Sequence, residues 1–188
     1  MSENLNDALK TYAREVLRFA MVMNLTSVRD EKEFWQRFIT PSLELLPWLP
    51  EGGRLLDIGS GMGIPGIPLL LARRGLYGLL VERRRKRAEF LRHLVRSLPF
   101  SAEVYDEDIL HMPALEADVC VARAVAEPVQ LLKMAGKHLV AGGRSVLPVA
   151  RGVQVVQYSG WEFELAGEIN AGHERQAVHV YKYVGGFT

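Results

Sequence analysis

The feature that most constrains this chain is a glycine-rich turn between a short apolar run and a helical pattern. The run RLLDI covers residues 54–58, the turn GSGMGIPG follows it, and a helix is predicted at about 64–74. A strand that enters a helix through such a turn is typical of a parallel strand–helix–strand unit. The same alternation continues along the chain, which favours a doubly wound parallel sheet with helices on both faces.

Short apolar runs typical of buried strands recur between the predicted helices. Strands are expected at 54–58, 77–82, 102–106, 118–122, 144–149, 160–167 and 176–184. Between these strands, besides the helix at about 64–74, helices are expected at 84–98 and 127–138. The last two strands are expected to form a hairpin joined by GEINAGHE. The predicted fold class is therefore α/β, with a mostly parallel sheet and an N-terminal helical extension.

The N-terminal region is predicted to be helical. Apolar side chains recur at helical spacing over residues 5–22, which indicates an amphipathic helix. Asp30, followed three residues later by Glu33, matches a capping box at the start of a second helix. Pro41 is expected to interrupt that second helix, because proline has no N–H to donate.

Length and composition fit one domain. The 188 residues, 48% of them hydrophobic, suffice for one compact core, with a helical region at 1–50 and a cofactor-binding core at 51–188. A formal net charge of +1 leaves any binding of nucleic acid to a local patch. The single cysteine, Cys120, excludes an intramolecular disulfide. Without a bilayer-length apolar run or the layout of a signal peptide, the chain is expected to be a cytoplasmic monomer with no membrane contact.

Two classes of cofactor compete for the glycine-rich turn. Gly61, Gly63 and Gly66 spell G-x-G-x-x-G, which binds the pyrophosphate of a dinucleotide. Asp57, Gly59, Gly61 and Gly63 spell D-x-G-x-G-x-G, with a carboxylate at the entrance. A pyrophosphate needs free N–H groups and no nearby anion, whereas S-adenosylmethionine carries a sulfonium and an ammonium. The carboxylate favours S-adenosylmethionine and leaves a nicotinamide nucleotide as the alternative.

Further candidate residues follow the ends of other strands, where ligands of such sheets bind. Glu82 can accept hydrogen bonds from both ribose hydroxyls of either cofactor. Asp108 and Ile109 can contact the amino group and the face of an adenine, or they belong to a solvated turn. Arg123 directly follows the run DVCVA and is predicted to contact the cofactor or an RNA phosphate, the alternative being an ion pair with a nearby acid.

A basic run opens the predicted helix at 84–98. It consists of Arg83, Arg84, Arg85, Lys86 and Arg87. Cations at a helix N-terminus oppose the helix dipole, and phosphate groups would offset this unfavourable placement. The run therefore predicts an RNA-binding patch, with a solvated helix start as the alternative.

Neither a serine–histidine–acid arrangement nor a metal-ligand spacing is evident in the sequence, so no metal is expected. Methyl transfer to an atom with a free lone pair, such as N7 of guanine, needs in-line positioning and no general base. No residue is therefore assigned as catalytic, and Arg123 is expected to position the reactants.

Several motifs occur in the order found in the bacterial 16S ribosomal RNA guanine-N7 methyltransferases, also called glucose-inhibited division protein B. They are NLTSVRD at 24–30, DIGSGMGIPGIPL at 57–69, VERRRKRAEFLR at 81–92, VARA around Arg123, GGR at 142–144 and ERQAVHVYK at 174–182. From about residue 20 the chain resembles this family. The resemblance implies a seven-stranded class I (Rossmann-like) methyltransferase fold, S-adenosylmethionine as donor, and a guanine of 16S ribosomal RNA, free or in the small subunit, as acceptor.

The resemblance also assigns individual residues. The cofactor-binding positions of the family correspond to Gly59, Ile64, Asp108, Ile109 and Arg123, and its basic pair corresponds to Lys86 and Arg87. The family pattern R-H-x-x-D-S is RFITPS here, so that Phe38 and Pro41 replace a histidine and an aspartate. Glu107 stands where an arginine is common.

The function predicted is transfer of a methyl group from S-adenosylmethionine to guanine N7 in 16S ribosomal RNA, which gives 7-methylguanosine. Two alternatives stay open. The first is a non-catalytic RNA-binding protein with a vestigial cofactor pocket, suggested by Phe38 and Pro41. The second is a methyltransferase that acts on a small molecule.

Overall fold

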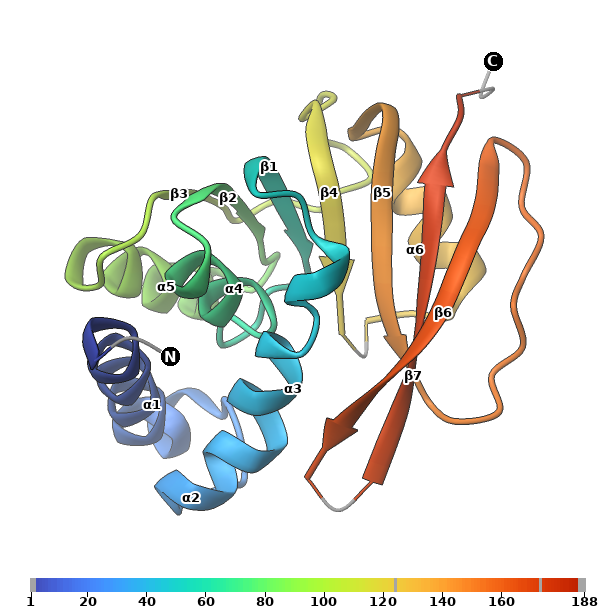
Figure 1. Cartoon of the computed structure of the whole chain (residues 1–188). Helices are drawn as coiled ribbons and strands as arrows, with labels where there is room; N and C mark the ends of the chain where they lie inside the picture. The colour runs from blue at the N-terminus through green and yellow to red at the C-terminus, as the bar shows by residue number, and fades with distance from the viewer. Residues whose placement is uncertain (1–2, 124, 173, 186–188) are drawn as a thin grey trace.

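The computed structural model describes residues 3–123, 125–172 and 174–185, and these form one seven-stranded sheet (Figure 1). The strands are β1 Gly52–Ile58, β2 Gly75–Val81, β3 Ala102–Tyr105, β4 Ala117–Ala122, β5 Leu139–Val149, β6 Trp161–Ala171 and β7 Glu174–Tyr183. Their order is β3-β2-β1-β4-β5-β7-β6. Strands β1 to β5 pair in parallel, while β7 runs antiparallel to both β5 and β6. The predicted α/β class and the C-terminal hairpin are confirmed.

Helices cover both faces of the sheet. The longer ones are α1 Glu3–Met23, α4 Gly66–Ala72, α5 Arg85–Ser97 and α6 Pro128–Gly136. Buried side chains of α1, α4 and α5 share one apolar cluster with Leu55 and Val119 of the sheet. Alternate positions, such as Leu56 and Cys120, face the other way and pack with α6. Period-two alternation along the strands therefore divides the core into two layers, as expected of a doubly wound sheet.

The N-terminal helices lie on the α4 and α5 side of the sheet (Figure 1). Tyr12, which is fully buried in α1, donates a hydrogen bond from its hydroxyl to the carbonyl of Met62 in the glycine-rich turn, at 3.0 Å. Asp30 caps the next helix by accepting a hydrogen bond from the Glu33 N–H, as the capping-box pattern predicts. None of the described helices combines the length and apolarity needed to cross a bilayer.

The expectation that Pro41 interrupts the second helix is wrong. Helical backbone continues from α2 Glu31–Phe34 through a π-helical segment, Trp35–Ile39, into α3 Thr40–Leu43, before a 3-10 turn at Leu46–Trp48. In the π-helical segment the N–H of Thr40 bonds to the carbonyl of Trp35, five residues back. This wider turn precedes the proline and lets the chain pass the residue that cannot donate.

Several strand boundaries differ from those predicted, most of all the start of β5 and the end of β6. Strand β5 begins at Leu139 rather than 144, because a register irregularity opposite Ala117 and Val119 accommodates the glycines at 142 and 143. Strand β6 continues to Ala171, so most of GEINAGHE is strand, and residue 173 lies outside the described residues. Gly167, which resembled a turn residue, lies in β6 because its missing side chain leaves room for Trp48.

Candidate functional site

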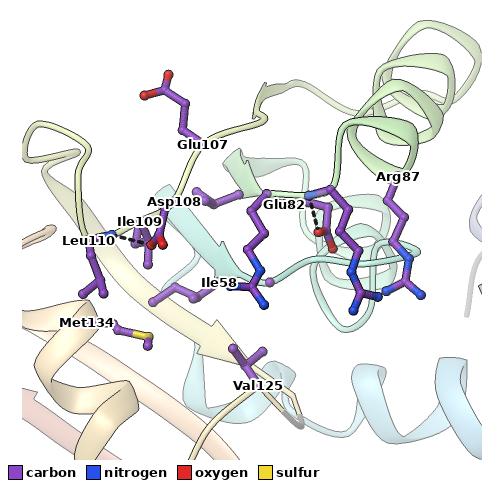
Figure 2. Close-up of a pocket in the computed structure, with 13 residues that line it drawn as sticks. Ile58, Glu82, Arg87, Glu107, Asp108, Ile109, Leu110, Val125 and Met134 are labelled. Atoms are coloured by element: carbon purple, nitrogen blue, oxygen red, sulfur yellow. Dashed lines mark hydrogen bonds between the residues drawn. The ribbon is translucent and has the colours of Figure 1, made fainter.

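A pocket of about 390 Å³ opens where the parallel strands end (Figure 2). Its walls come from the last residues of β1 and β2, from the segments that follow β1, β2, β3 and β4, and from one residue of α6. They are Ile58, Gly59, Val81, Glu82, Arg83, Arg84, Arg87, Glu107, Asp108, Ile109, Leu110, Val125 and Met134. This is the edge at which ligands of doubly wound sheets bind.

The glycine-rich turn uses its backbone N–H groups internally. Gly59 and Ser60 donate to the Val81 carbonyl, Gly61 to the Glu82 carboxylate, Gly63 and Ile64 to the Ser60 carbonyl, Gly66 to the Asp57 carboxylate, and Ile67 to the Gly63 carbonyl. A pyrophosphate site requires such groups to point at the ligand. These seven N–H groups are already paired, two of them with carboxylates, so this turn is a poor cradle for phosphate.

The shape of the turn depends on glycine at its centre. Gly63 has a φ of +98°, and a side chain there would overlap with Ile67. Ile64 is buried in the core and lies behind the pocket wall rather than on it. Gly61 and Gly63 likewise shape the turn without lining the pocket, whereas Gly59 does line it.

Asp57 is fully buried at the end of β1 and is not part of the pocket wall. Its Oδ2 accepts the Gly66 N–H at 3.1 Å, while its Oδ1 has no hydrogen-bond partner among the described residues. Burial raises the pKa of Asp57 to about 7, partly opposed by the bonds from Gly66 and Ser60. An unpartnered carboxylate oxygen in this place favours a positively charged neighbour.

Glu82 is held in place by two backbone donors. Its Oε2 accepts the N–H of Gly61 at 3.0 Å, and its Oε1 accepts the N–H of Arg84 at 2.8 Å. The residue is 6% exposed and lines the pocket. The carboxylate therefore joins the glycine-rich turn of β1 to the start of α5 and keeps a fixed acceptor at the pocket.

An apolar side of the pocket faces Glu82. Ile109, Leu110 and Met134 lie opposite Glu82 and Arg87 (Figure 2), and Asp108 accepts the Leu110 N–H at 3.1 Å. This arrangement offers apolar contacts to a flat ring next to a fixed carboxylate. The sequence predicted Asp108 and Ile109 but missed Leu110, Val125 and Met134. In the sequence, the only indication that these three residues line a pocket is that they are apolar and lie in segments that follow or face strand ends.

The basic run divides into exposed and anchored residues. Helix α5 begins at Arg85, and Arg83, Arg84, Arg85 and Lys86 are exposed. Arg87 is half-buried and donates from Nη2 to the carbonyl of Asn24 at 2.8 Å. Arg83, Arg84 and Arg87 line the pocket, which the sequence did not foresee. The run thus supplies both free surface charge and a link to the N-terminal helices.

Arg123 follows β4 but lies outside the pocket wall. Its Nη2 donates to the carbonyl of Arg37 at 3.0 Å, and its guanidinium lies 5.1 Å from the ring centre of Phe38. In the part of the chain that the structure describes, Arg123 makes no ion pair with Glu107, Asp108 or Glu127. The ion-pair alternative is therefore not supported.

Comparison with known proteins identifies a family and several relatives of this chain. A family model described as "GidB: rRNA small subunit methyltransferase G" matches residues 5–154. A ribosomal RNA small subunit methyltransferase G of Alkalilimnicola ehrlichii is 35% identical over 153 residues, which cover 77% of this chain and 69% of that protein. A protein of the same name from Roseiflexus castenholzii is 38% identical over 146 residues, covering 73% of this chain and 62% of the relative.

Solved structures share this fold at low sequence identity. An S-adenosylmethionine-dependent methyltransferase from Aquifex aeolicus is 13% identical with a TM-score of 0.60, covering 81% of this chain and 93% of that one. A mutant of MtNAS, crystallised with S-adenosylmethionine, is 20% identical with a TM-score of 0.62, covering 95% and 76%. At these identities the likeness concerns the fold alone.

Proposed function

The chain belongs to the GidB family, described as rRNA small subunit methyltransferase G, and from this membership we propose that it methylates N7 of a guanine in 16S ribosomal RNA. The proposal includes S-adenosylmethionine as the donor, RNA or the small ribosomal subunit as the partner, and the cytoplasm as the place of action. The seven-stranded, mostly parallel sheet and the pocket at its carboxyl edge are consistent with this chemistry.

The glycine-rich turn is the observation that carries the choice of cofactor. Its backbone donors are paired internally, and two carboxylates, Asp57 and Glu82, take the bonds of Gly66 and Gly61. Such a turn repels a pyrophosphate and tolerates a cationic ligand. The unpartnered Oδ1 of Asp57 adds a buried acceptor that suits an ammonium or a sulfonium. The residues present therefore fit S-adenosylmethionine better than a nicotinamide dinucleotide.

Each part of the donor has candidate residues in the proposal. The methionine end would be held by Asp57, Gly59, Gly61, Gly63 and Ile64. Glu82 would bind the ribose hydroxyls, and Asp108 and Ile109 would contact the adenine. Arg123 would line the cofactor crevice from the side of β4 and position the reactants. When bound, the donor supplies a methyl group on a sulfonium, which is a good leaving group. Glu82, whose orientation is fixed by two N–H groups, requires no rearrangement to accept hydrogen bonds from the ribose hydroxyls.

The acceptor needs orientation rather than a base. Guanine N7 has a free lone pair, so that the chain's contribution is to hold the ring in line with the methyl group. The exposed cations of residues 83–86 lie beside the pocket and suit RNA phosphates, and Arg123 provides a further cation at the same edge of the sheet. A splayed-out guanine is the form in which such a pocket can reach N7.

The test is methyl transfer from labelled S-adenosylmethionine to unmodified 16S RNA and to small subunits, followed by mapping of 7-methylguanosine. One labelled guanine per RNA, absent with the Glu82→Ala variant, is the expected result. Donor binding without transfer to either substrate would favour a non-catalytic RNA-binding protein. Transfer to small molecules only would overturn the RNA part of the proposal.

A further inference from the structure

Arg123 is held by contacts that neither the family resemblance nor the pocket explains. Its Nη2 donates to the Arg37 carbonyl at 3.0 Å, and its guanidinium carbon lies 5.1 Å from the ring centre of Phe38. A cation at that distance from an aromatic ring is attracted by the ring face. Two supports from the π-helical segment Trp35–Ile39 therefore act on one side chain at the end of β4.

The Arg37 carbonyl lies in an irregular part of the helical region, just before Pro41. In this π-helical segment the N–H of Thr40 bonds five residues back, to Trp35, and the proline that follows has no N–H to donate. The Arg123 guanidinium donates to the Arg37 carbonyl beside this wider turn. The segment thus presents a backbone acceptor to Arg123.

A residue of the C-terminal hairpin lies near Arg123. Arg123 and Gln176 of β7 line the same small cavity, of about 10 Å³, together with Pro41 and Ser42. Arg123 Nη1 and Gln176 Oε1 are both buried and have no hydrogen-bond partner among the described residues. An unpaired donor and an unpaired acceptor on two residues that line one cavity make Gln176 a candidate partner of the Arg123 guanidinium.

The charge of Arg123 is not balanced by a carboxylate. Burial, followed by the nearby charge of Arg37, lowers the pKa of Arg123 from its ordinary value. A partly buried cation supported by a ring face and by neutral oxygens keeps its attraction for an external anion. An aspartate in contact would reduce that attraction.

We infer that Phe38 and Gln176 are positioning residues, which hold the Arg123 guanidinium in one orientation so that it can bind a phosphate of the acceptor RNA. The inference rests on the proposed function, since RNA is the anion to be oriented. Phe38 acts through its ring face and Gln176 through its amide oxygen. The Arg37 carbonyl contributes the backbone acceptor.

The first test replaces the ring of Phe38. Phe38→Leu should raise the KM for RNA about tenfold and change kcat by less than twofold, while Phe38→Tyr, which keeps the ring, should restore the wild-type KM. Phe19→Leu is a matched control, because Phe19 is also half-buried and has an arginine, Arg18, 5.2 Å from its ring centre. The control should lower thermal stability without changing the KM.

The second test needs no activity. The ring of Phe38 should shift the NMR signals of the Arg123 guanidinium protons upfield, and the shift should persist in Phe38→Tyr but vanish in Phe38→Leu. In an Arg123→Met background, neither Phe38→Leu nor Gln176→Met should change RNA affinity further.

The outcomes separate the two claims. A wild-type protein that transfers no methyl group to RNA would contradict the proposed function, while the NMR signals would still test the contacts of Arg123. An active protein whose Phe38→Leu variant keeps both the wild-type KM and the upfield shift would overturn the inference. Effects of Phe38→Leu that persist unchanged in the Arg123→Met background would overturn it as well.

Discussion

The glycine-turn side of the site is held together by contacts that are close in sequence, and the arginine side is not. The bond from Gly66 to Asp57 spans 9 positions, and the bond from Gly61 to Glu82 spans 21. All four residues lie in the segment that runs from β1 to the start of α5. Apart from the bond that the Tyr12 hydroxyl of α1 donates to the Met62 carbonyl, this unit carries its geometry within its own sequence.

The arginine side depends on the docking of the N-terminal helices. Arg123 reaches the Arg37 carbonyl across 86 positions, and Arg87 reaches the Asn24 carbonyl across 63. Neither contact exists until the helical region has packed on the sheet. The comparison teaches that the two halves of one site can be perturbed separately, one through local carboxylates and the other through remote carbonyls.

The largest expected effect comes from the buried carboxylate of the glycine-turn side. Burial raises the pKa of Asp57 from 3.8 to about 7, so the folded protein binds this proton more tightly than the unfolded chain does. The contribution of Asp57 to stability is therefore greatest below about pH 4 and is lost as the pH rises to about 7. As the pH rises from about 4 to about 7, the free energy of unfolding of Asp57→Asn should therefore increase by a few kcal/mol relative to that of wild type, measured by urea unfolding at each pH. Equal pH dependence of both proteins would contradict this assignment.

The second prediction weakens the link between the glycine-rich turn and the start of α5. In Glu82→Gln one of the two backbone donors loses its acceptor, because an amide has only one oxygen. Affinity for S-adenosylmethionine should fall by roughly 10- to 100-fold in calorimetric titration. Glu107→Gln is the control, since Glu107 belongs to the same pocket but points away from the other labelled side chains (Figure 2). A similar loss in both variants would show that net charge alone matters.

The third prediction divides the basic run. Arg87→Gln should remove the bond to Asn24 and lower stability by about 1–2 kcal/mol. Lys86 is exposed, so Lys86→Gln should leave stability unchanged. It should reduce the slope of log affinity for RNA against log salt concentration by about one. Thermal unfolding and RNA titration at several salt concentrations measure the two effects. An exchange of the two results would reverse the roles given to these neighbours.

The smallest expected effect comes from the cap of the helix that leads to the arginine side. Asp30 accepts the Glu33 N–H at 2.9 Å and starts the helix that leads into the π-helical segment. Asp30→Ala should destabilise the protein by about 1 kcal/mol and leave donor affinity within twofold of wild type. Chemical unfolding and calorimetry check both values. A tenfold loss of donor affinity would mean that the two sides are not separable.

Features of the structure that depend on neighbouring residues were predictable from the sequence. The strand–turn–helix unit, the cap at Asp30 and the hairpin follow from periodicity and from the turn residues. Of the expected cofactor residues, Gly59, Glu82, Asp108 and Ile109 do line the pocket. Their place at strand ends follows from the rule that parallel strands share one carboxyl edge.

The contacts that escaped prediction are long-range or run against a local rule. Pro41 ordinarily ends a helix, but here a π-helical segment precedes it, and the Arg37 carbonyl of that segment accepts a bond from Arg123, which follows β4. The anchoring of Arg87 at Asn24 depends on how α1 docks, which no local pattern specifies. Leu110 and Met134 meet in the pocket only because the sheet places the segment after β3 beside α6.

The most direct measurement is calorimetric titration of the wild-type protein with S-adenosylmethionine and, in a separate experiment, with NAD. A turn whose N–H groups are already paired and whose neighbours are carboxylates should bind one molecule of S-adenosylmethionine and give no heat with NAD. Saturable binding of NAD, with no binding of S-adenosylmethionine, would contradict the central claim about this crevice.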